Sequence, residues 1–193
     1  KYRAYKYRIS PTKQQEVLIA KHLGSCRFIY NYALAKKVKA YQVDGTNLSR
    51  FDIQADLPNM KKSDEYCWLK EVNSLSLQAS LANLDSAYTK FFREHKGFPN
   101  FKSKKDSKQS FSIPQNTKVD FENGRVFIPK FKIGIKAKLH RTFEGIVKSS
   151  TITRTSTGKY FISILVEVNE SDVPMKPICE SKAVGIDLGI KTF

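Results

Sequence analysis

Cysteine is scarce in this sequence, and the few cysteines present lie far apart. They are Cys26, Cys67 and Cys179, and no two of them stand in a Cys-x-x-Cys arrangement. This spacing excludes a four-cysteine zinc knuckle built from this chain. An odd number of scattered cysteines is typical of a reducing compartment, and we expect all three to be buried or inert thiols.

Long apolar runs and catalytic histidine patterns are also missing. No stretch of about 18 apolar residues is present, so we expect no membrane-spanning segment. The first residues, 1–5, are polar and aromatic, unlike a signal peptide. His22, His95 and His140 have no partners at the spacing of a metal site or a catalytic triad, and the glycines form no phosphate-binding loop.

Acidic residues are outnumbered by basic ones. The sequence has 34 Lys and Arg against 18 Asp and Glu, which gives a formal net charge of +16. Such a charge repels itself in the compact state unless a polyanion neutralises it. Nucleic acid is the default partner for this balance, and an anionic membrane surface is the alternative. With 40% hydrophobic residues, the 193-residue chain can build one large domain or two small ones.

Helical patterns dominate up to about residue 97. Alternation over 2–9 first predicts a short strand with one apolar and one basic face. The capping box Thr12-x-x-Gln15 then predicts a helix that ends at Gly24, followed by a second helix from Ser25 to about Tyr41. Two helices joined at a tight glycine turn suggest a helix-turn-helix unit. A short helix over 49–56 is expected next, and the strongest helix begins near Ser76 with the apolar stripe Leu77, Leu81, Leu84, Tyr88 and Phe91.

Strand patterns dominate after a loop at 97–110. Alternating apolar residues predict strands near 126–128, 130–136, 151–155 and 160–168, with a hairpin turn at Ser156-Thr157-Gly158. These strands and the one at 2–9 predict a small antiparallel barrel, so the chain is of the α+β class with helices inserted after the first strand. Residues 169–181 are interpreted as a linker before a buried strand at 183–191.

Asp187 is a single carboxylate near the end of that last apolar strand. Burying such a group without a partner is costly, which makes a Mg²⁺ ligand one interpretation. In two-metal hydrolysis, carboxylates hold the ions that activate water and stabilise the leaving oxygen. A strand-end Asp that caps a turn at Leu188-Gly189 is the other interpretation. Since no partner acids stand upstream at convincing spacing, the local sequence leaves both open.

Basic residues next to polar and aromatic ones are the candidate nucleic-acid contacts. The lysines over 130–138 predict a basic strand face that binds phosphates, against the alternative of an ordinary solvated face. Tyrosines beside cations can stack on unpaired bases, although core packing is their commoner role. Ser74 and Gln78 lie one helical turn apart, and Gln can contact adenine in a major groove, although both also suit an ordinary polar helix face. The candidate set is Lys6, Arg8, Arg27, Tyr30, Asn31, Arg50, Ser74, Gln78, Lys102, Lys104, Lys105, Lys130, Lys132, Lys136 and Lys138.

A series of short motifs in a fixed order resembles the OrfB or TnpB proteins of bacterial insertion sequences. The motifs include Gly24-Ser25-Cys26-Arg27-Phe28-Ile29-Tyr30-Asn31 and Gly185-Ile186-Asp187-Leu188-Gly189-Ile190-Lys191. The other matching segments are 7–15, 68–72, 77–78, 87–92, 97–102 and 158–160. Together they run through nearly the whole chain.

The resemblance implies a layout and an activity. Residues 1–10 and 97–178 would form a wedge-like β-barrel, 11–96 an inserted helical recognition lobe, and 179–193 the start of an RNase-H-like, RuvC-type nuclease domain. Asp187 would be its first catalytic carboxylate and a Mg²⁺ ligand. The expected partners are a guide RNA and the target DNA that pairs with it, and the expected location is the nucleoid in the cytoplasm of a bacterium or archaeon.

The sequence departs from the family pattern at its end. It stops at Phe193, before the family's later catalytic acids and its zinc knuckle, so we expect the Mg²⁺ site to be incomplete and this chain alone to be inactive. A stand-alone, non-catalytic binding module or regulatory relic is the alternative to the front part of a nuclease. A transposase of different chemistry is the third possibility. A reading frame that continues past Phe193 with two more acids and paired Cys-x-x-Cys motifs would favour the nuclease.

Overall fold

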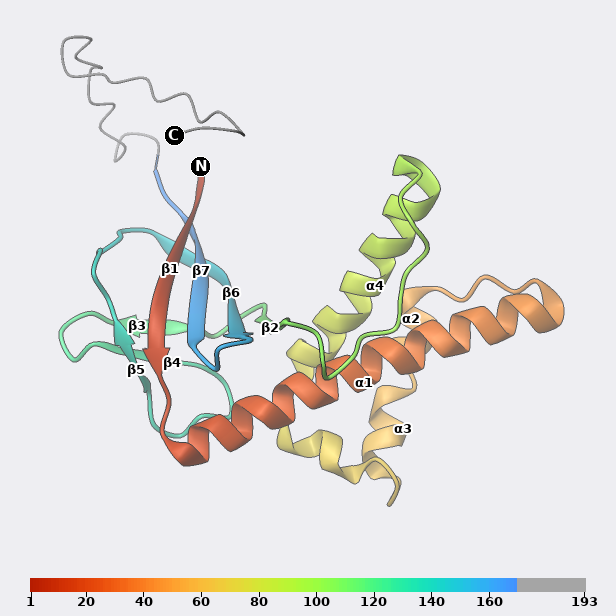
Figure 1. Cartoon of the computed structure of the whole chain (residues 1–193), viewed down its shortest axis with the longest axis horizontal. Coiled ribbons are helices and arrows are strands. Elements are labelled where there is room, and N and C mark those ends of the chain that lie inside the picture. Colours follow the sequence, from red (N-terminus) through yellow and green to blue (C-terminus); the bar gives the residue numbers. More distant parts are fainter. Residues whose placement is uncertain (170–193) are drawn as a thin grey trace, which may run out of the picture.

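The computed structural model describes residues 1–169, in which a group of helices is inserted between the first two strands of a sheet (Figure 1). The predicted strand with Asp187, and Cys179, lie outside the described residues. The elements in chain order are β1 (Tyr2–Ser10), α1 (Lys13–Asp44), α2 (Arg50–Gln54), α3 (Leu57–Lys62), the 3-10 helix η1 (Cys67–Glu71), α4 (Ser74–Glu94), β2 (Lys108–Ile113), β3 (Lys118–Asp120), β4 (Arg125–Phe127), β5 (Ile135–Lys138), β6 (Ile146–Thr155) and β7 (Tyr160–Glu167).

The strands form a seven-stranded sheet in the order β2-β6-β7-β1-β5-β4-β3, and every neighbouring pair is antiparallel. The first strand, β1, sits in the middle between β7 and β5. The α+β class is therefore confirmed. The closed barrel is wrong for the described residues, because no pairing joins the edge strands β2 and β3.

The sheet is nevertheless strongly curled. Only residues 114–117 connect Ile113 on one edge strand to Lys118 on the other, and five extended residues span at most about 17 Å. The edges of a flat sheet of this size would lie about 29 Å apart, at roughly 4.8 Å per strand. The buried hydroxyls of Thr117 and Ser150 lie 2.6 Å apart and tie this connection to β6. The curl gives the sheet a concave inner face, where the apolar core lies.

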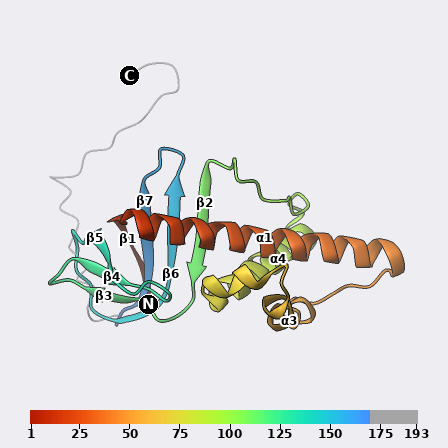
Figure 2. The same cartoon turned by 90° about the horizontal axis from the view of Figure 1, so that it is seen from below.

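Helix α1 is one continuous helix of 32 residues that connects the sheet to the other helices. It runs past the strands and continues beside α4 (Figure 2). Its capping box at Thr12 and Gln15 is as predicted, and Gly45 ends it with a φ of 71°. The predicted turn at Gly24 is wrong, because that residue lies inside the helix. Burial explains the continuity, since Leu23, Cys26 and Ile29 on both sides of Gly24 pack into one core.

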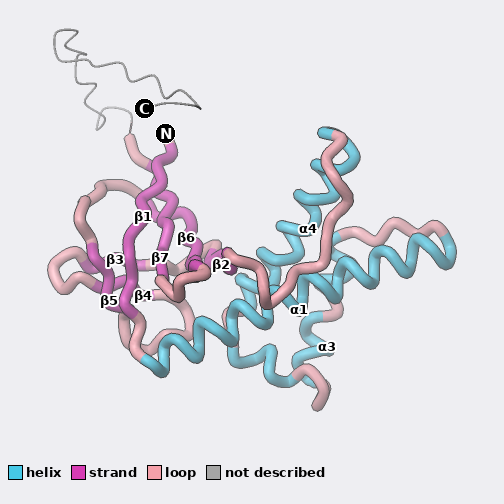
Figure 3. Tube along the Cα trace, in the orientation of Figure 1, coloured by secondary structure: helices cyan, strands magenta, loops and turns pink. Residues whose placement is uncertain are grey.

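Helices and strands occupy separate halves of the molecule, with α1 shared between them (Figure 3). Leu77, Leu81 and Leu84 of the predicted α4 stripe are buried, and Leu69 of η1 is fully buried beside them. The inner face of the sheet contributes Phe111, and its ring stacks on His22 of α1 with centroids 4.9 Å apart. A common apolar core therefore joins the two halves.

Several local predictions differ from the structure. The segment 97–110, interpreted as a loop, contains the start of β2, and residues 130–134 form a turn rather than a strand. Lys130 there has a φ of 74°, and Ile133, expected to face the core, is 67% exposed. The short helix predicted over 49–56 corresponds to α2, which ends at Gln54, and α3 follows it with Pro58 in its first turn, where proline is tolerated. Cys26 is buried as expected, whereas Cys67 is exposed.

Candidate nucleic-acid interface

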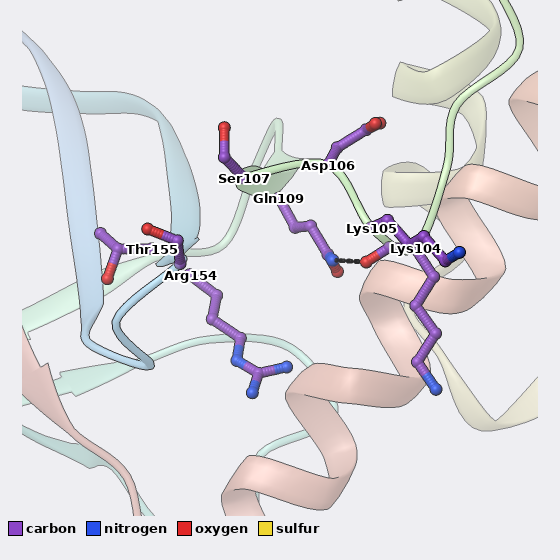
Figure 4. Close-up of a pocket in the computed structure, with 8 residues that line it drawn as sticks. Lys104, Lys105, Asp106, Ser107, Gln109, Arg154 and Thr155 are labelled. Carbon is purple, nitrogen blue, oxygen red and sulfur yellow. Dashed lines mark hydrogen bonds between the residues drawn. The ribbon is translucent and has the colours of Figure 1, made fainter.

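Cationic side chains from α1, the 102–108 segment and β6 gather where the helices meet the sheet. Two hollows of about 260 and 120 Å³ share Asp106 and Gln109 in their walls, and we call the pair the basic groove. Its cations are Arg27, Lys102, Lys104, Lys105, Lys108 and Arg154. Asp106 is the one carboxylate among the residues that line it. Figure 4 shows the larger hollow, with Arg154 extending from β6 toward α1.

The basic groove is held in shape by Asn31 on α1. Its side-chain amide donates to the carbonyl of Lys102 over 2.9 Å, and its oxygen accepts from the Lys102 amide over 2.8 Å. This pair of bonds fixes the backbone where the 102–108 segment begins. The Lys102 ammonium lies 4.2 Å from the centre of the Tyr30 ring, and burial lowers the pKa of Lys102. Asn31 is therefore a positioning residue for a groove cation.

Asp106, the only acidic residue that lines the basic groove, accepts a hydrogen bond from the backbone of a turn. The Asp106 carboxylate accepts a bond of 3.0 Å from the Ser103 amide, and the Ser103 hydroxyl accepts one of 3.1 Å from the Lys105 amide. Gln109 reaches across to the Lys104 carbonyl over 2.5 Å, a bond that Figure 4 marks. The turn thus presents Lys104 and Lys105 together, and the carboxylate serves the backbone instead of a groove cation.

Arg154 is a groove residue that the sequence analysis missed. It stands two positions after the buried Ile152 on β6, so it shares the inner face of the sheet, and it pairs with Gln109 on β2. At this end of the strand the inner face no longer covers core but borders α1. A cation in phase with Ile152, next to the hairpin turn at 156–158, was the signal available in the sequence.

A second basic hollow lies at the start of α1, and we call it the N-terminal hollow. It has a volume of about 720 Å³, and its cations are Lys13, Arg125, Lys130, Lys132 and Lys136. Three of the four lysines predicted for a basic strand face therefore gather here, although Lys130 and Lys132 come from a turn. Lys130 is already engaged, because it donates to the Lys70 carbonyl over 3.0 Å.

The remaining predicted cations of the strands lie on the outer, solvent-facing side of the sheet. Lys6 and Arg8 are exposed and alternate along β1 with the buried Tyr7 and Ile9. Lys138 pairs directly with Arg8 across β1 and β5. Side chains at such paired positions are about 5 Å apart at Cβ and point the same way. The basic face predicted for the first strand is therefore present.

Besides Lys6, Arg8, Lys138 and Asn31, four more predicted contacts do not line the basic groove or the N-terminal hollow. Tyr30 is only 5% exposed and faces Lys102, so the structure gives it a packing role in place of base stacking. The Arg50 guanidinium lies 4.7 Å from the centre of the Phe51 ring. On α4, the Ser74 hydroxyl accepts a bond of 2.6 Å from Lys61, and Gln78 is half-buried. The structure does not unite these side chains with the basic groove.

Metal ligands are not clustered in the part of the chain that the structure describes. Within residues 1–169, no group of three or more His, Cys, Asp or Glu side chains is placed to hold a metal ion. The same residues include no helix long and apolar enough to cross a bilayer. The described residues therefore do not fit a Mg²⁺ site, and the proposed ligand, Asp187, lies outside them.

Comparison with known proteins agrees with the motifs. A family model described as a helix-turn-helix domain, that of the IS605 OrfB proteins, matches residues 1–46, which here form β1 and the single helix α1. The chain is 35% identical over 187 residues, 97% of its length, to "Putative RNA-guided DNA endonuclease InsQ" of Escherichia coli strain K12. It is 30% identical over 193 residues, 99% of its length, to a "Putative RNA-guided DNA endonuclease" of Streptomyces pristinaespiralis.

The chain spans 45% and 47% of those two relatives, or about half their length. A third relative, "Virulence protein VsdF" of Salmonella dublin, is 38% identical in a match of 111 residues that covers 53% of this chain and 93% of VsdF. The family match at the N-terminus and the two similarities that cover nearly all of this chain point to the same family. The chain belongs to the OrfB/TnpB family of insertion-sequence proteins.

Proposed function

We propose that this chain is the nucleic-acid-binding front part of an RNA-guided DNA endonuclease and binds guide RNA and target DNA. The basic groove is the observation that carries the proposal. It brings together cations from residues 27, 102–108 and 154, and its one lining carboxylate bonds to a turn. Such a groove attracts phosphates of any sequence, which suits a protein in which base pairing to an RNA selects the target.

Asp187 is the one residue of this chain to which we assign a part in DNA cleavage. We propose that this residue is the first carboxylate of an RNase-H-like, RuvC-type nuclease domain that continues into the half of the relatives not spanned here. When bound by a full set of acids, Mg²⁺ supplies activation of water and stabilisation of the leaving oxygen. Residues 1–169 offer no such set, so their role in the proposal is binding.

Salt dependence of binding tests the groove directly. The variant Lys104→Gln/Lys105→Gln/Arg154→Gln removes three charges from the basic groove. The control Lys39→Gln/Lys62→Gln/Lys118→Gln removes three charges at exposed positions outside the basic groove and the N-terminal hollow. Each phosphate contact contributes about 0.9 to the slope of log affinity against log salt for duplex DNA. We expect the groove variant to flatten the slope by roughly 2–3 while the control leaves it nearly unchanged. Equal slopes for the two variants would place the phosphate contacts elsewhere.

A stand-alone binding module is the second candidate. VsdF favours it, because a match of 111 residues covers 93% of that relative, which is therefore shorter than this chain. Sequencing the RNA that co-purifies with the chain, expressed together with its flanking DNA, separates the two candidates. One enriched RNA species encoded beside the gene is expected for the nuclease part, whereas an unselected sample of cellular RNA would support the module.

A further inference from the structure

The outer face of the sheet carries one aromatic ring among cations and hydroxyls. The strand pairings place Ser110, Thr153, Phe161, Arg8 and Lys138 in one row across β2, β6, β7, β1 and β5. The next row consists of Ser112, Thr151, Ser163 and Lys6. We call these two rows the Phe161 face. None of their residues is acidic, and Lys6, Arg8 and Lys138 are exposed.

Phe161 is out of place on a solvent-facing surface. Its neighbours along β7, Ile162 and Ile164, point into the core, whereas Phe161 lies on the opposite side and is only half-buried. The ammonium of Lys6 lies 4.8 Å from the centre of its ring. A half-buried ring on the outer side of the sheet, with a cation on its face and small hydroxyl side chains beside it, can accept a flat ligand.

We propose that the Phe161 face binds an unpaired segment of a nucleic acid by stacking one base on the Phe161 ring. Exposed aromatic rings stack on bases of any identity, but only where the base is not buried in a duplex. Lys6 and Arg8 flank the ring and neutralise the phosphates on either side of the stacked nucleotide. Once the base covers the ring, the Lys6 ammonium turns from the ring to a phosphate.

This site shares only Ser110 with the lining of the basic groove, and it rests on the proposed nucleic-acid function. The groove lies on the inner face, where Arg154 is in phase with Ile152, whereas Phe161 is in phase with the outer residues Thr153 and Arg8. A duplex and an unpaired strand can therefore occupy one molecule at the same time. The chain would bind the paired part of its nucleic acid in the groove and a neighbouring single strand on the opposite side of the sheet.

Two substitutions on one strand separate stacking from general binding. Phe161→Leu keeps an apolar side chain but removes the aromatic face. Leu165→Ala, four residues along the same face of β7 and 36% exposed, is the matched control. We expect Phe161→Leu to weaken binding of a 12-nucleotide oligouridine or oligothymidine about tenfold, with little change for a duplex of the same length. The Leu165→Ala affinities should stay within about twofold. The two oligonucleotides show whether the strand is RNA or DNA.

Fluorescence gives a readout that a structural effect would not produce. Trp68 is the one tryptophan in the sequence, so the double variant Trp68→Phe/Phe161→Trp places a single reporter on the outer face. A base stacked on that ring quenches its emission, whereas binding elsewhere does not. Strong quenching by the oligonucleotide but not by the duplex is the expected result. Unchanged emission on bound oligonucleotide, or equal effects of Phe161→Leu and Leu165→Ala, would overturn the stacking site while leaving the basic groove intact. Loss of the proposed function would appear instead as no binding of duplex or RNA.

Discussion

His22 connects α1 to the start of α4 through a hydrogen bond to Asn73, although its sequence context gave it no role. The side chain is fully buried. Its Nε2 accepts a hydrogen bond from the backbone N–H of Asn73 over 3.0 Å. Nδ1 therefore carries the proton and donates to the Leu18 carbonyl over 2.8 Å. Asn73 is also the N-cap of α4. The neutral ring therefore fits this position, and burial lowers the pKa of His22 below its ordinary value of 6.5.

The stability of the fold should depend on pH through His22. Well above pH 6.5 the ring is neutral in both the folded and the unfolded state. As pH falls below that value, the unfolded chain binds a proton that the folded chain excludes, so the free energy of unfolding decreases by up to about 1.4 kcal/mol per pH unit. Urea unfolding between pH 7.5 and 5 measures this decrease. His22→Gln should lower stability at pH 7.5 and flatten the pH dependence.

His95→Asn is the matched control for that measurement. His95 is exposed at the end of α4 with a φ of 51°, a conformation that asparagine also tolerates. The control should keep the pH dependence of the wild type. The assignment to His22 would fail if His95→Asn flattened the curve and His22→Gln did not.

At the scale of single elements, α1 shows why a strong local signal can mislead. Glycine commonly ends a helix, so a helix end at Gly24 was the natural interpretation of the sequence. A glycine inside a helix, however, costs only about 1 kcal/mol relative to alanine. Burial of the neighbouring Leu23, Cys26 and Ile29 outweighs this cost. Gly45 ends the helix instead, because no buried residue follows there to continue it.

Replacing Gly24 by alanine tests the continuous helix. A Cβ at this position would meet only the Arg27 side chain, at 3.9 Å. Gly24→Ala should therefore raise the free energy of unfolding by about 0.5–1 kcal/mol, since alanine favours a helix interior. Gly45→Ala, at a left-handed φ of 71°, should lower it by about 1 kcal/mol. Chemical denaturation of the wild type and both variants measures these changes. If Gly24→Ala lowered the free energy of unfolding, the result would support a turn at this position and contradict the continuous helix.

The elements that the sequence predicted best are those with long, regular apolar patterns. The α4 stripe and the β6–β7 hairpin lie where their periodicity indicated. β2 was missed because Lys108-Gln109-Ser110 is polar at the sheet edge, and only Phe111 and Ile113 face the core. The turn at 130–134 has alternating apolar residues and was therefore predicted as a strand, although of Phe131 and Ile133 only Phe131 is buried.

The candidate site was predictable in its residue types but not in its assembly. Arg27 and the lysines of 102–105 were identified from charge alone. Their proximity depends on Asn31 binding the Lys102 peptide 71 residues away, which no local pattern shows. Arg154 joins them only through the pairing of β6 with β2. The face of a strand follows from its alternation, but which helix borders that face follows only from the fold.

At the scale of the whole molecule, the net charge of +16 sets the response to polyanions. A ligand that binds only the folded state at about 100 times its Kd adds about 2.7 kcal/mol to the unfolding free energy. For a chain of this size we expect a 12-base-pair duplex at that excess to raise the Tm by roughly 5–10 °C. Thermal denaturation with and without the duplex measures the shift, and the groove variant should show a smaller one. An equal shift with an uncharged polymer of the same mass would contradict the electrostatic origin.

The central position of β1 has a consequence for how the protein is made. Tyr2 pairs with Glu167, a separation of 165 residues, and β5 on the other side also follows the helices. At a translation rate of roughly 5–20 residues per second, β1 leaves the ribosome some ten to thirty seconds before β7 is available to it. The helices of residues 13–94 need only nearer neighbours and can form in that interval. The nascent chain therefore carries an unpaired strand in which the core residues Tyr7 and Ile9 are exposed to solvent. We expect a chaperone to bind this segment until β7 is synthesised.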